Sequence, residues 1–403
     1  MRRNFDSRSK IFPPEAQKTL KNVQQRDLTI KTICGDVVLK AAYGQDRESG
    51  QMVMPLQEKL GLDGSMSPAL EDRLCHLAVV TASYSQATES AKKFGISTNN
   101  SQIQRLVQRM GGQALEQEAQ RISAAFDRQK SKEIIEKAEL ELKGERFSMV
   151  LMLDGTKLRA RGDDWGMKPE TQPGDRVAWH ELKAGLVIRV PEASDGQQQE
   201  AEKWYVAADG GPELIGRKLY AEALHRGLNQ AQRVCVVADG AAWIWNLAAE
   251  HFPGSLEELD FYHASEHMWG LARALNNNDE DAAKNWVTPL LHNLKHQGGE
   301  ELLSVLDELS KTAEAKELTA EQQKTLNREV AYFHNHKSRL DYPKVKSLGL
   351  PIGSGSMESA CSQLQGRFKR TGQFWSRAGE RNLLALELAR RNNIWDKIWV
   401  NSA

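Results

Sequence analysis

Two aspartates stand at the ends of apolar runs that are typical of buried strands. Asp154 follows the run 147–153, Asp239 follows the run 234–238, and a glycine comes after each of them. Strands covered on both faces of an α/β sheet have such continuous apolar runs, and open α/β sheets bind ligands at the carboxyl ends of their strands. Carboxylate oxygens are the hard ligands that Mg²⁺ prefers. The two runs therefore predict a divalent-metal site at one sheet edge.

A third acidic residue, Glu358, lies in the first turn of a helix that the pattern predicts over 357–369. An acid at this position complements the helix dipole and needs no catalytic role. The preceding Gly-Ser-Gly-Ser turn is also a ready anion site, so a phosphate could lie beside Ser354 and Ser356. No Lys-Ser or Lys-Thr pair follows, so the turn is not a nucleotide-binding P-loop.

The overall composition is that of an ordinary globular protein. The 403 residues carry 54 Lys plus Arg and 54 Asp plus Glu, with 40% apolar residues. The length suits two or three domains, and the balanced charge argues mildly against a nucleic-acid partner, although local basic patches matter more than the sum. The four cysteines form no Cys-x-x-Cys pair, and no membrane-length apolar run occurs. We therefore expect reduced thiols in a soluble, cytoplasmic protein without a membrane partner.

Two segments in the first part of the chain predict structure without chemistry. Residues 1–67 are predicted as a β-hairpin region, because short β-type alternation surrounds a turn at Gly35-Asp36. Residues 113–145 are predicted as one long polar connector helix with sparse apolar positions. The sequence does not decide whether that helix joins domains or forms an oligomer contact.

Between these segments, residues 68–112 have the spacing of a helix-turn-helix. A short amphipathic helix leads to a turn at Gly95-Ile96, and capping residues then precede a second helix over 102–110. A recognition helix reads bases with Asn, Gln and Arg side chains. The predicted DNA contacts of this region are Asn99, Asn100, Gln102 and Arg105. A helical bundle without DNA binding has the same pattern and remains an alternative.

The remainder predicts an α/β core with a helical insertion. Three strands, a helix, and then alternating strand and helix is the order of an RNase H-like domain. The expected strands are 148–161, 179–190, 203–208, 233–239 and 256–262, and the expected helices are 212–227 and 241–251. The predicted domains are an RNase H-like core over 146–265 and 350–375, an all-α insertion over 266–349 that ends in a loop over 344–351, and a basic C-terminal helix over 376–403.

The last part of the chain is locally basic. Between Arg367 and Lys397 it holds eight basic and three acidic residues, with aromatic residues interleaved. Such a segment suits a phosphate backbone, each contact adding a salt-dependent increment of affinity. The expected DNA contacts here are Arg367, Lys369, Arg370 and Arg377. A solvated helix face would have a similar composition.

Four motifs together give the chain a family resemblance. They are Leu153-Asp-Gly-Thr156, Ala238-Asp-Gly-Ala-Ala-Trp-Ile-Trp245, Asp260-Phe-Tyr-His263 and Gly353-Ser-Gly-Ser-Met-Glu-Ser359. In them the chain resembles bacterial insertion-sequence DDE transposases of the Kra group, which are distantly Mutator-like. The resemblance implies that Asp154, Asp239 and Glu358 form a metal-binding catalytic triad. It also implies two Mg²⁺ ions roughly 3.5–4 Å apart, with Mn²⁺ as a substitute.

The same resemblance implies the reaction and the partners. The chain would cleave DNA strands and transfer them, with transposon ends and target DNA as double-stranded partners, in a homodimer or higher oligomer. Asp260 and His263 match a motif that accompanies the triad, so they are expected to contact phosphate or DNA together with Ser354 and Ser356. His263 could equally be a hydrogen-bonded core histidine. Relatives often carry a cysteine-rich knuckle after the hairpin, but 43–54 has no cysteine, so zinc is not expected there.

Two other functions compete with this interpretation. His263-Ala-Ser-Glu-His267 matches the HxxEH motif of inverted zinc metalloproteases, with Glu266 as general base. That motif needs a further ligand from a later helix, and the predicted strand over 256–262 leaves His263 at a strand end. The other rival is a non-catalytic DNA-binding regulator derived from a transposase. Asp209, at the end of a shorter and less apolar strand, competes with Asp239 for a place in the triad.

Overall fold

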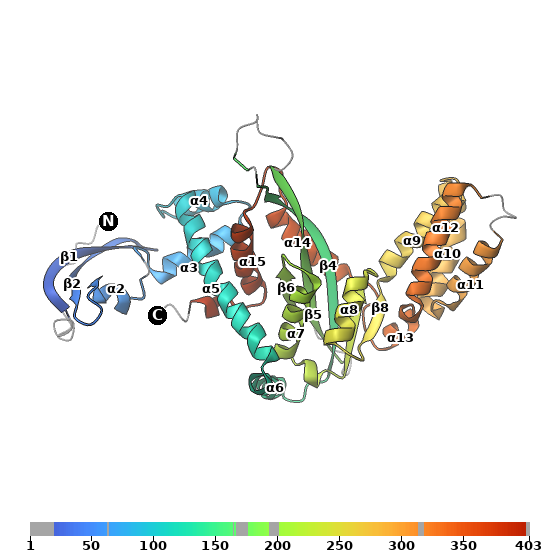
Figure 1. Ribbon diagram of the computed structural model, residues 1–403, viewed down its shortest axis with the longest axis horizontal. Helices are drawn as coiled ribbons and strands as arrows, with labels where there is room; N and C mark the ends of the chain where they lie inside the picture. The colour runs from blue at the N-terminus through green and yellow to red at the C-terminus, as the bar shows by residue number, and fades with distance from the viewer. Residues whose placement is uncertain are drawn as a thin grey trace. The chain divides into compact units, whose positions relative to one another are not determined.

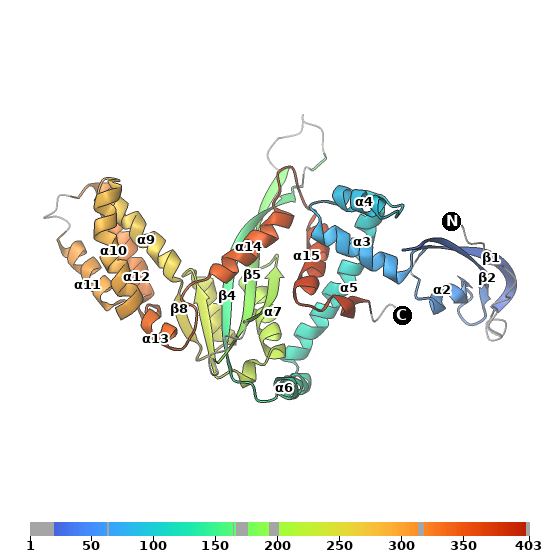
Figure 2. The same ribbon diagram turned by 180° about the vertical axis from the view of Figure 1, so that it is seen from behind.

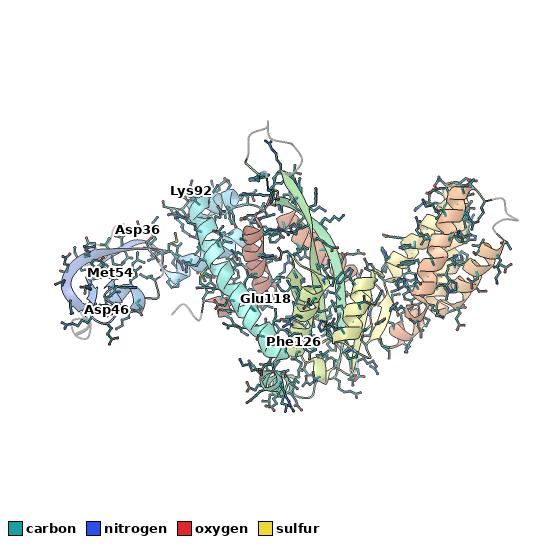
Figure 3. All side chains as sticks on the ribbon, viewed as in Figure 1. Asp36, Asp46, Met54, Lys92, Glu118 and Phe126 are labelled. Atoms are coloured by element: carbon teal, nitrogen blue, oxygen red, sulfur yellow. The ribbon has the colours of Figure 1, made fainter. Side chains whose placement is uncertain are left out.

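The computed structural model describes residues 20–62, 64–163, 165–166, 176–192, 201–312 and 318–399 (Figures 1 and 2). The chain divides into two compact units. We call Met1–Gln117 with Ala378–Ala403 the terminal unit, and Glu118–Arg377 the core unit. The division falls within one helix, α5 (Asn100–Phe126), on which Glu118 and Phe126 are labelled in Figure 3. The predicted boundary between residues 112 and 113 also lies inside α5, so it is wrong as a boundary between two helices.

The terminal unit begins with a small antiparallel sheet. It consists of β1 (Leu20–Thr32), β2 (Gly35–Asp46) and β3 (Met52–Val53), followed by the short helix α2 (Pro55–Lys59). The hairpin is confirmed, but its turn lies at Ile33-Cys34 instead of Gly35-Asp36, because Gly35 already pairs with Thr32. Gly35 has φ +110°, a conformation that favours glycine. A small core around Leu28 and Ile30 holds the sheet together.

Helices make up the rest of the terminal unit. They are α3 (Pro68–Val80), α4 (Tyr84–Lys93), the first part of α5, α15 (Arg377–Arg391) and the 3₁₀ turn η4 (Trp395–Ile398). Helix α3 begins at the predicted cap, where the Ser67 hydroxyl accepts the Leu70 N–H. Helices α5 and α15 touch through their backbones, since a Cβ on Gly111 would lie 2.3 Å from the Asn382 carbonyl oxygen. The predicted basic C-terminal helix is thus packed into the unit, and it is not an exposed tail.

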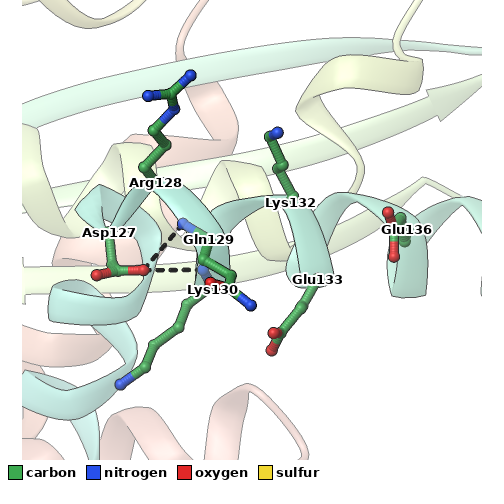
Figure 4. Close-up of a pocket in the computed structure, with 7 residues that line it drawn as sticks. All are labelled: Asp127, Arg128, Gln129, Lys130, Lys132, Glu133 and Glu136. Atoms are coloured by element: carbon green, nitrogen blue, oxygen red, sulfur yellow. Dashed lines mark hydrogen bonds between the residues drawn. The ribbon is translucent and has the colours of Figure 1, made fainter.

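The predicted connector helix over 113–145 is wrong as a single element, because the chain breaks at Asp127. Helix α5 ends at Phe126 and α6 (Arg128–Leu142) begins, with the Asp127 carboxylate accepting the N–H groups of Gln129 and Lys130. Figure 4 shows this cap together with the residues that line a surface depression. The depression has a volume of ≈ 970 Å³. The seven lining residues all belong to this one turn and its helix, so the depression is a hollow on a solvated helix.

A mixed five-stranded sheet forms the centre of the core unit. Its strands are β4 (Phe147–Arg161), β5 (Val177–Pro191), β6 (Glu202–Ala208), β7 (Arg233–Ala238) and β8 (Leu256–Leu259). They lie in the order β6-β5-β4-β7-β8, with β4, β5 and β6 antiparallel and β7 and β8 parallel to β4. All five predicted strands are present. The apolar runs predicted them because both faces of the central strands are buried.

Helices cover both faces of this sheet. Helices α7 (Pro212–His225) and α8 (Ala242–His251) pack on the face that carries Leu151 and Leu153. Helix α14 (Gly355–Phe368) lies across the other face, as the view from behind shows (Figure 2). The sheet therefore presents one face to α14, and residues pointing from the strands to that face can meet the residues of this helix.

The described residues between β8 and α14 are helical wherever they have regular structure. The elements are α9 (Phe261–Leu275), α10 (Glu280–Gln297), α11 (Glu300–Lys311), α12 (Ala320–Asn335), η3 (Lys337–Arg339) and α13 (Tyr342–Ser347). Two predictions at the borders of this helical segment are wrong. Strand β8 stops at Leu259 because Asp260 caps α9, and the predicted loop over 344–351 contains the end of α13. None of the described helices combines the length and apolar character that a membrane span requires.

Candidate active site

The strand register brings Asp154 and Asp239 side by side. Strands β4 and β7 pair in parallel from Ser148 opposite Arg233 to Met152 opposite Val237. Continuing that register by two residues sets Asp154 opposite Asp239. Residues in register on neighbouring strands point to the same face. Since Leu151 and Leu153 point toward α7, Asp154 and Asp239 point toward the face that α14 covers.

The electrostatics of Asp154 agree with this placement. Burial raises the pKa of its carboxyl above the ordinary value, and the nearby charges of Asp239 and Glu181 raise it further. Hydrogen bonds from the Gly155 N–H, at 2.6 Å, and from the Cys361 thiol oppose the rise. A carboxylate that is half-buried beside another carboxylate is destabilised in its charged form. A bound cation would relieve that repulsion.

Helix α14 runs beside Asp154. The thiol of Cys361 donates to the Asp154 carboxylate, and burial together with that carboxylate raises the pKa of Cys361 to about 12. One turn further, the Gln365 side-chain amide donates to the Thr156 hydroxyl at 2.8 Å. Glu358 lies one turn before Cys361, at the i, i+3 spacing that shares a helix face. Its side chain is exposed.

The structure thus brings two of the three predicted acids together, and places the third on the helix beside them. Among the described residues, no three acidic, histidine or cysteine side chains are gathered closely enough to hold a metal ion. Asp239 is fixed from its own side, because its Oδ1 accepts the Ala241 N–H at 3.0 Å at the start of α8.

Asp260 serves the fold and does not offer a surface to DNA. Its carboxylate is buried, and one oxygen accepts the Tyr262 N–H at 2.7 Å. The other oxygen accepts both the N–H of Ser354, at 3.0 Å, and the Ser354 hydroxyl. One carboxylate therefore ties the start of α9 to the start of α14. Of the predicted phosphate contacts, Asp260 and Ser354 bind one another, and Ser356 accepts a hydrogen bond from Lys203 at 3.0 Å.

The two histidines of the HxxEH motif lie on helix α9, so the expected strand-end position of His263 is wrong. The rings of His263 and His267 are 5.0 Å apart. His267 Nδ1 lies 2.6 Å from the buried carboxylate of Glu329, and its ring stacks on Tyr332 at 3.9 Å. The second histidine of the motif is therefore held in a packed pair. Nothing in the described part of the chain supplies the cluster that a zinc protease needs.

Tyr332 is a residue of the site that sequence reasoning missed. Its hydroxyl donates to the backbone carbonyl of Asp239 at 3.0 Å. Burial and the charges of Asp239 and Glu329 raise the pKa of Tyr332 well above its ordinary value, so the hydroxyl stays a donor. The next residue after Asp239, Gly240, has φ +98°, and a Cβ there would lie 3.0 Å from both the Tyr332 hydroxyl and His336 Nε2. Only glycine fits under α12 at this point.

Three of the four predicted base-reading residues help to build their own turn. The Asn99 side chain accepts the Gln102 N–H at 3.0 Å. The Asn100 side chain accepts from the Thr88 hydroxyl at 2.7 Å, and the Gln102 side chain accepts from the Thr98 hydroxyl at 3.3 Å. Arg105 is exposed, with only a local bond to the Ser101 carbonyl. The turn is well defined, and of these four Arg105 is the residue best placed for a partner.

The predicted basic contacts of the C-terminal part also divide. Arg367 is buried at 7% exposure against the rings of Phe368 and Trp375, so its prediction as a DNA contact is wrong. Lys369 and Arg370 are exposed. The Arg377 guanidinium forms an ion pair with the Asp209 carboxylate at 3.6 Å. Asp209 is the acid that competed with Asp239 for a place in the predicted triad. The prediction from composition treated these four basic residues alike, whereas the fold leaves only some of them at the surface.

Comparison with known proteins gives one family. Its model, described as an uncharacterised protein family, UPF0236, matches residues 15–139 and 220–399. Asp239 and Glu358 lie in the second matched segment, and Asp154 lies in the unmatched stretch 140–219 between the two segments. A search of curated proteins finds no match. More than half of the chain is matched, and the chain belongs to the uncharacterised protein family UPF0236.

Proposed function

We propose that this chain cleaves and transfers DNA strands with the help of divalent metal ions, as a DDE transposase does. The observation that carries the proposal is the register that puts Asp154 beside Asp239, under the helix that bears Glu358. The strand order β6-β5-β4-β7-β8 and the helices between β8 and α14 support the further proposal of an RNase H-like core with an all-α insertion.

The residues present fit a divalent cation. Asp154 and Asp239 offer hard oxygen ligands, and burial, with a smaller contribution from the charge of Asp239, raises the pKa of Asp154 in the absence of a cation. Glu358 would complete the set after its exposed side chain turned toward Asp154, in the direction that Cys361 already takes from the same helix face. When bound, Mg²⁺ would polarise the phosphoryl group and lower the pKa of the attacking water or 3′-hydroxyl.

The protein's own contribution would be to hold these ligands in place. The Gly155 N–H and the Cys361 thiol orient Asp154, while the Ala241 N–H and the Tyr332 hydroxyl hold Asp239 at its side chain and its backbone. The carboxylate of Asp260 fixes the start of α14. In-line displacement at phosphorus asks mainly for positioning and charge stabilisation, and this arrangement provides for both.

A direct test uses the purified chain and DNA that carries the genomic sequences flanking its gene. We expect cleaved ends in Mg²⁺ or Mn²⁺ and intact DNA in EDTA. Tight binding of the same DNA without cleavage in either metal would instead support the non-catalytic regulator. Neither binding nor cleavage would contradict both interpretations.

Asp154→Asn is expected to stabilise the metal-free protein. The neutral amide removes the cost of burying a charged carboxylate, and with it the smaller repulsion by Asp239, so Tm at pH 7 should rise by about 2–4 °C, or about 1 kcal/mol for a unit of this size. The pKa of Asp154 is higher in the folded protein than its unfolded value of 3.8, so ionised Asp154 destabilises the wild type increasingly as pH rises above 3.8. Below that pH the difference in Tm between wild type and variant should vanish. Thermal scans in EDTA at several pH values measure this.

The same scans repeated in Mg²⁺ separate a metal site from a merely strained acid. Wild type should gain stability from Mg²⁺, and the Asp154→Asn variant should gain much less. Asp163→Asn, an exposed aspartate beyond the end of β4, is the control and should behave like wild type in both buffers. Equal stabilisation of all three proteins by Mg²⁺ would argue against a cation at Asp154.

Tyr332→Phe is expected to lower the cleavage rate without loosening DNA binding. The variant keeps the ring that stacks on His267 and loses only the bond to the Asp239 carbonyl. Losing one such bond costs about 1 kcal/mol, which corresponds to a several-fold to tenfold drop in the rate constant of cleavage if the bond positions Asp239. Single-turnover cleavage measures that rate constant, and a DNA-binding titration measures Kd. Tyr220→Phe is the control, and equal loss in both variants would remove Tyr332 from the site.

A further inference from the structure

The hairpin of β4 and β5 extends past the rest of the sheet. Strand β7 accompanies β4 only as far as Met152, whereas β4 and β5 stay paired as far as Arg161 opposite Val177. Trp375 joins the free edge of β4 through the Arg161 N–H at 2.8 Å and the Arg159 carbonyl at 3.3 Å. We call this extension, residues 155–161 with 177–183 and Trp375, the arm. Figures 1 and 2 show it projecting from the sheet of the core unit.

Aromatic rings and guanidinium groups alternate on the arm and in the residues next to it, Trp165 and Phe374. The Arg159 guanidinium lies 5.9 Å from the ring of Trp179 and 5.3 Å from the ring of Phe374. Arg161 lies 5.4 Å from the ring of Trp165, which in turn lies 4.9 Å from Phe374. These five residues form one connected cluster, which we call the arm patch.

The arm patch keeps large rings in solvent. Trp179 and Trp165 are 56% and 40% exposed. Exposing indole costs free energy in proportion to its apolar area, and the described residues leave these two rings open to this extent. Arg159 holds the cluster in shape through a bond of 2.6 Å to the Arg370 carbonyl. The rings are thus held ready and are not buried by the fold.

The arm patch is also positively charged. Lys157, Arg161, Lys369 and Arg370 are exposed on or beside it. Within the described part of the chain no carboxylate forms an ion pair with Arg159, Arg161 or Lys157, and the nearby Glu181 is paired with Lys183. Apart from Glu181, Asp163 is the exposed acid that the described residues place at this end of β4. As far as the described residues go, the surface therefore offers cations without an ion-pair partner next to accessible ring faces.

We propose that the arm patch binds unpaired nucleotides of a DNA strand. Exposed rings beside arginines stack on base faces while the cations contact phosphates, which is how proteins hold single strands without reading their sequence. In a duplex the base faces are covered by their neighbours, so ring stacking favours unpaired over paired DNA. The inference extends the proposed function by naming the state of the DNA, but binding in the absence of metal tests it independently of cleavage.

Trp179→Ala in the full chain tests the inference. A fluorescein-labelled dT oligonucleotide and a duplex of equal length are titrated in EDTA, with fluorescence anisotropy as the readout. Removing one stacked ring should weaken binding to the oligonucleotide by about 5- to 100-fold, while duplex binding changes by less than about twofold. Trp179→Phe should restore most of the affinity, because a ring face remains.

A second set of titrations tests the contribution of charge. Arg161→Ala should reduce the dependence of the logarithm of affinity on the logarithm of salt by about 0.7 for each phosphate that the arginine neutralises. Trp269→Ala is the matched control, since Arg273 lies 5.4 Å from that ring on helix α9, and it should bind the oligonucleotide like wild type. Failure of wild type to bind dT, or equal affinity of wild type and Trp179→Ala, would overturn the inference. Loss of cleavage in Asp239→Asn with unchanged dT binding by Trp179→Ala would leave the proposed function standing alone.

Discussion

Replacing Asp239 with asparagine is expected to lower Mg²⁺-dependent DNA cleavage by on the order of a thousandfold or more, while DNA affinity changes little. The asparagine keeps the volume of the side chain and can still accept the Ala241 N–H, so the start of α8 should survive. It removes one of two adjacent carboxylates, and with it the charge that a divalent cation needs. Single-turnover cleavage and a binding titration in Ca²⁺ measure the two quantities separately.

The control for this experiment is Glu266→Gln. Glu266 is exposed on α9 and would be the general base of a zinc protease, but it has no part in the proposed reaction. Cleavage by this variant should equal that of wild type. Full cleavage by Asp239→Asn would remove Asp239 from the catalytic set, and loss of activity in Glu266→Gln would direct attention to the HxxEH motif.

The second large effect concerns Glu258, and it should appear in stability. This β8 side chain is only 1% exposed, and its Oε1 has no hydrogen-bond partner among the described residues. Burial, with a smaller contribution from Asp341, raises its pKa from 4.5 to about 9. The folded state therefore keeps a proton that the unfolded state releases. The stability it contributes is complete below pH 4.5 and is lost as pH rises to about 9, by on the order of 5 kcal/mol.

Glu258→Gln should flatten this pH dependence. Urea unfolding of both proteins at pH 5, 7 and 9 gives the difference, which should grow with pH in favour of the variant. Glu136→Gln, on the exposed surface of α6, is the control and should follow wild type. Parallel curves for wild type and Glu258→Gln would mean that Glu258 ionises in the folded protein near its ordinary pKa.

The sheet could be predicted well because burial leaves a continuous apolar signature. The runs before Asp154 and Asp239 could be recognised without knowing their partners, and the parallel pairing then follows from the strand and helix order. The segment 256–262 misled for the same reason. Phe261 and Tyr262 extend the apolar run, but Asp260 caps a helix, and a cap competes with strand periodicity only once the chain is folded.

Contacts between distant residues could not be predicted. Tyr332 lies in a largely polar helix, and nothing in its neighbourhood indicates that its hydroxyl reaches the carbonyl of Asp239. The burial of Arg367 against the rings of Phe368 and Trp375 leaves no mark in the sequence either, because a basic segment has the same composition whether its cations are solvated or packed. The types of the site residues could be recognised along the chain, but tertiary packing decided which of them meet.

The carboxylate of Asp260 has a consequence for how this chain could vary. It accepts hydrogen bonds from Tyr262 and from Ser354, which lies 94 positions after Asp260. The helical excursion between β8 and α14 therefore begins and ends at one carboxylate, which acts as its anchor. The entropy of closing such a loop grows only with the logarithm of its length. Helices could therefore be gained or lost within the excursion at little cost to the spacing of Asp239 and Glu358, provided that the anchor and the tyrosine that reaches back to Asp239 are kept.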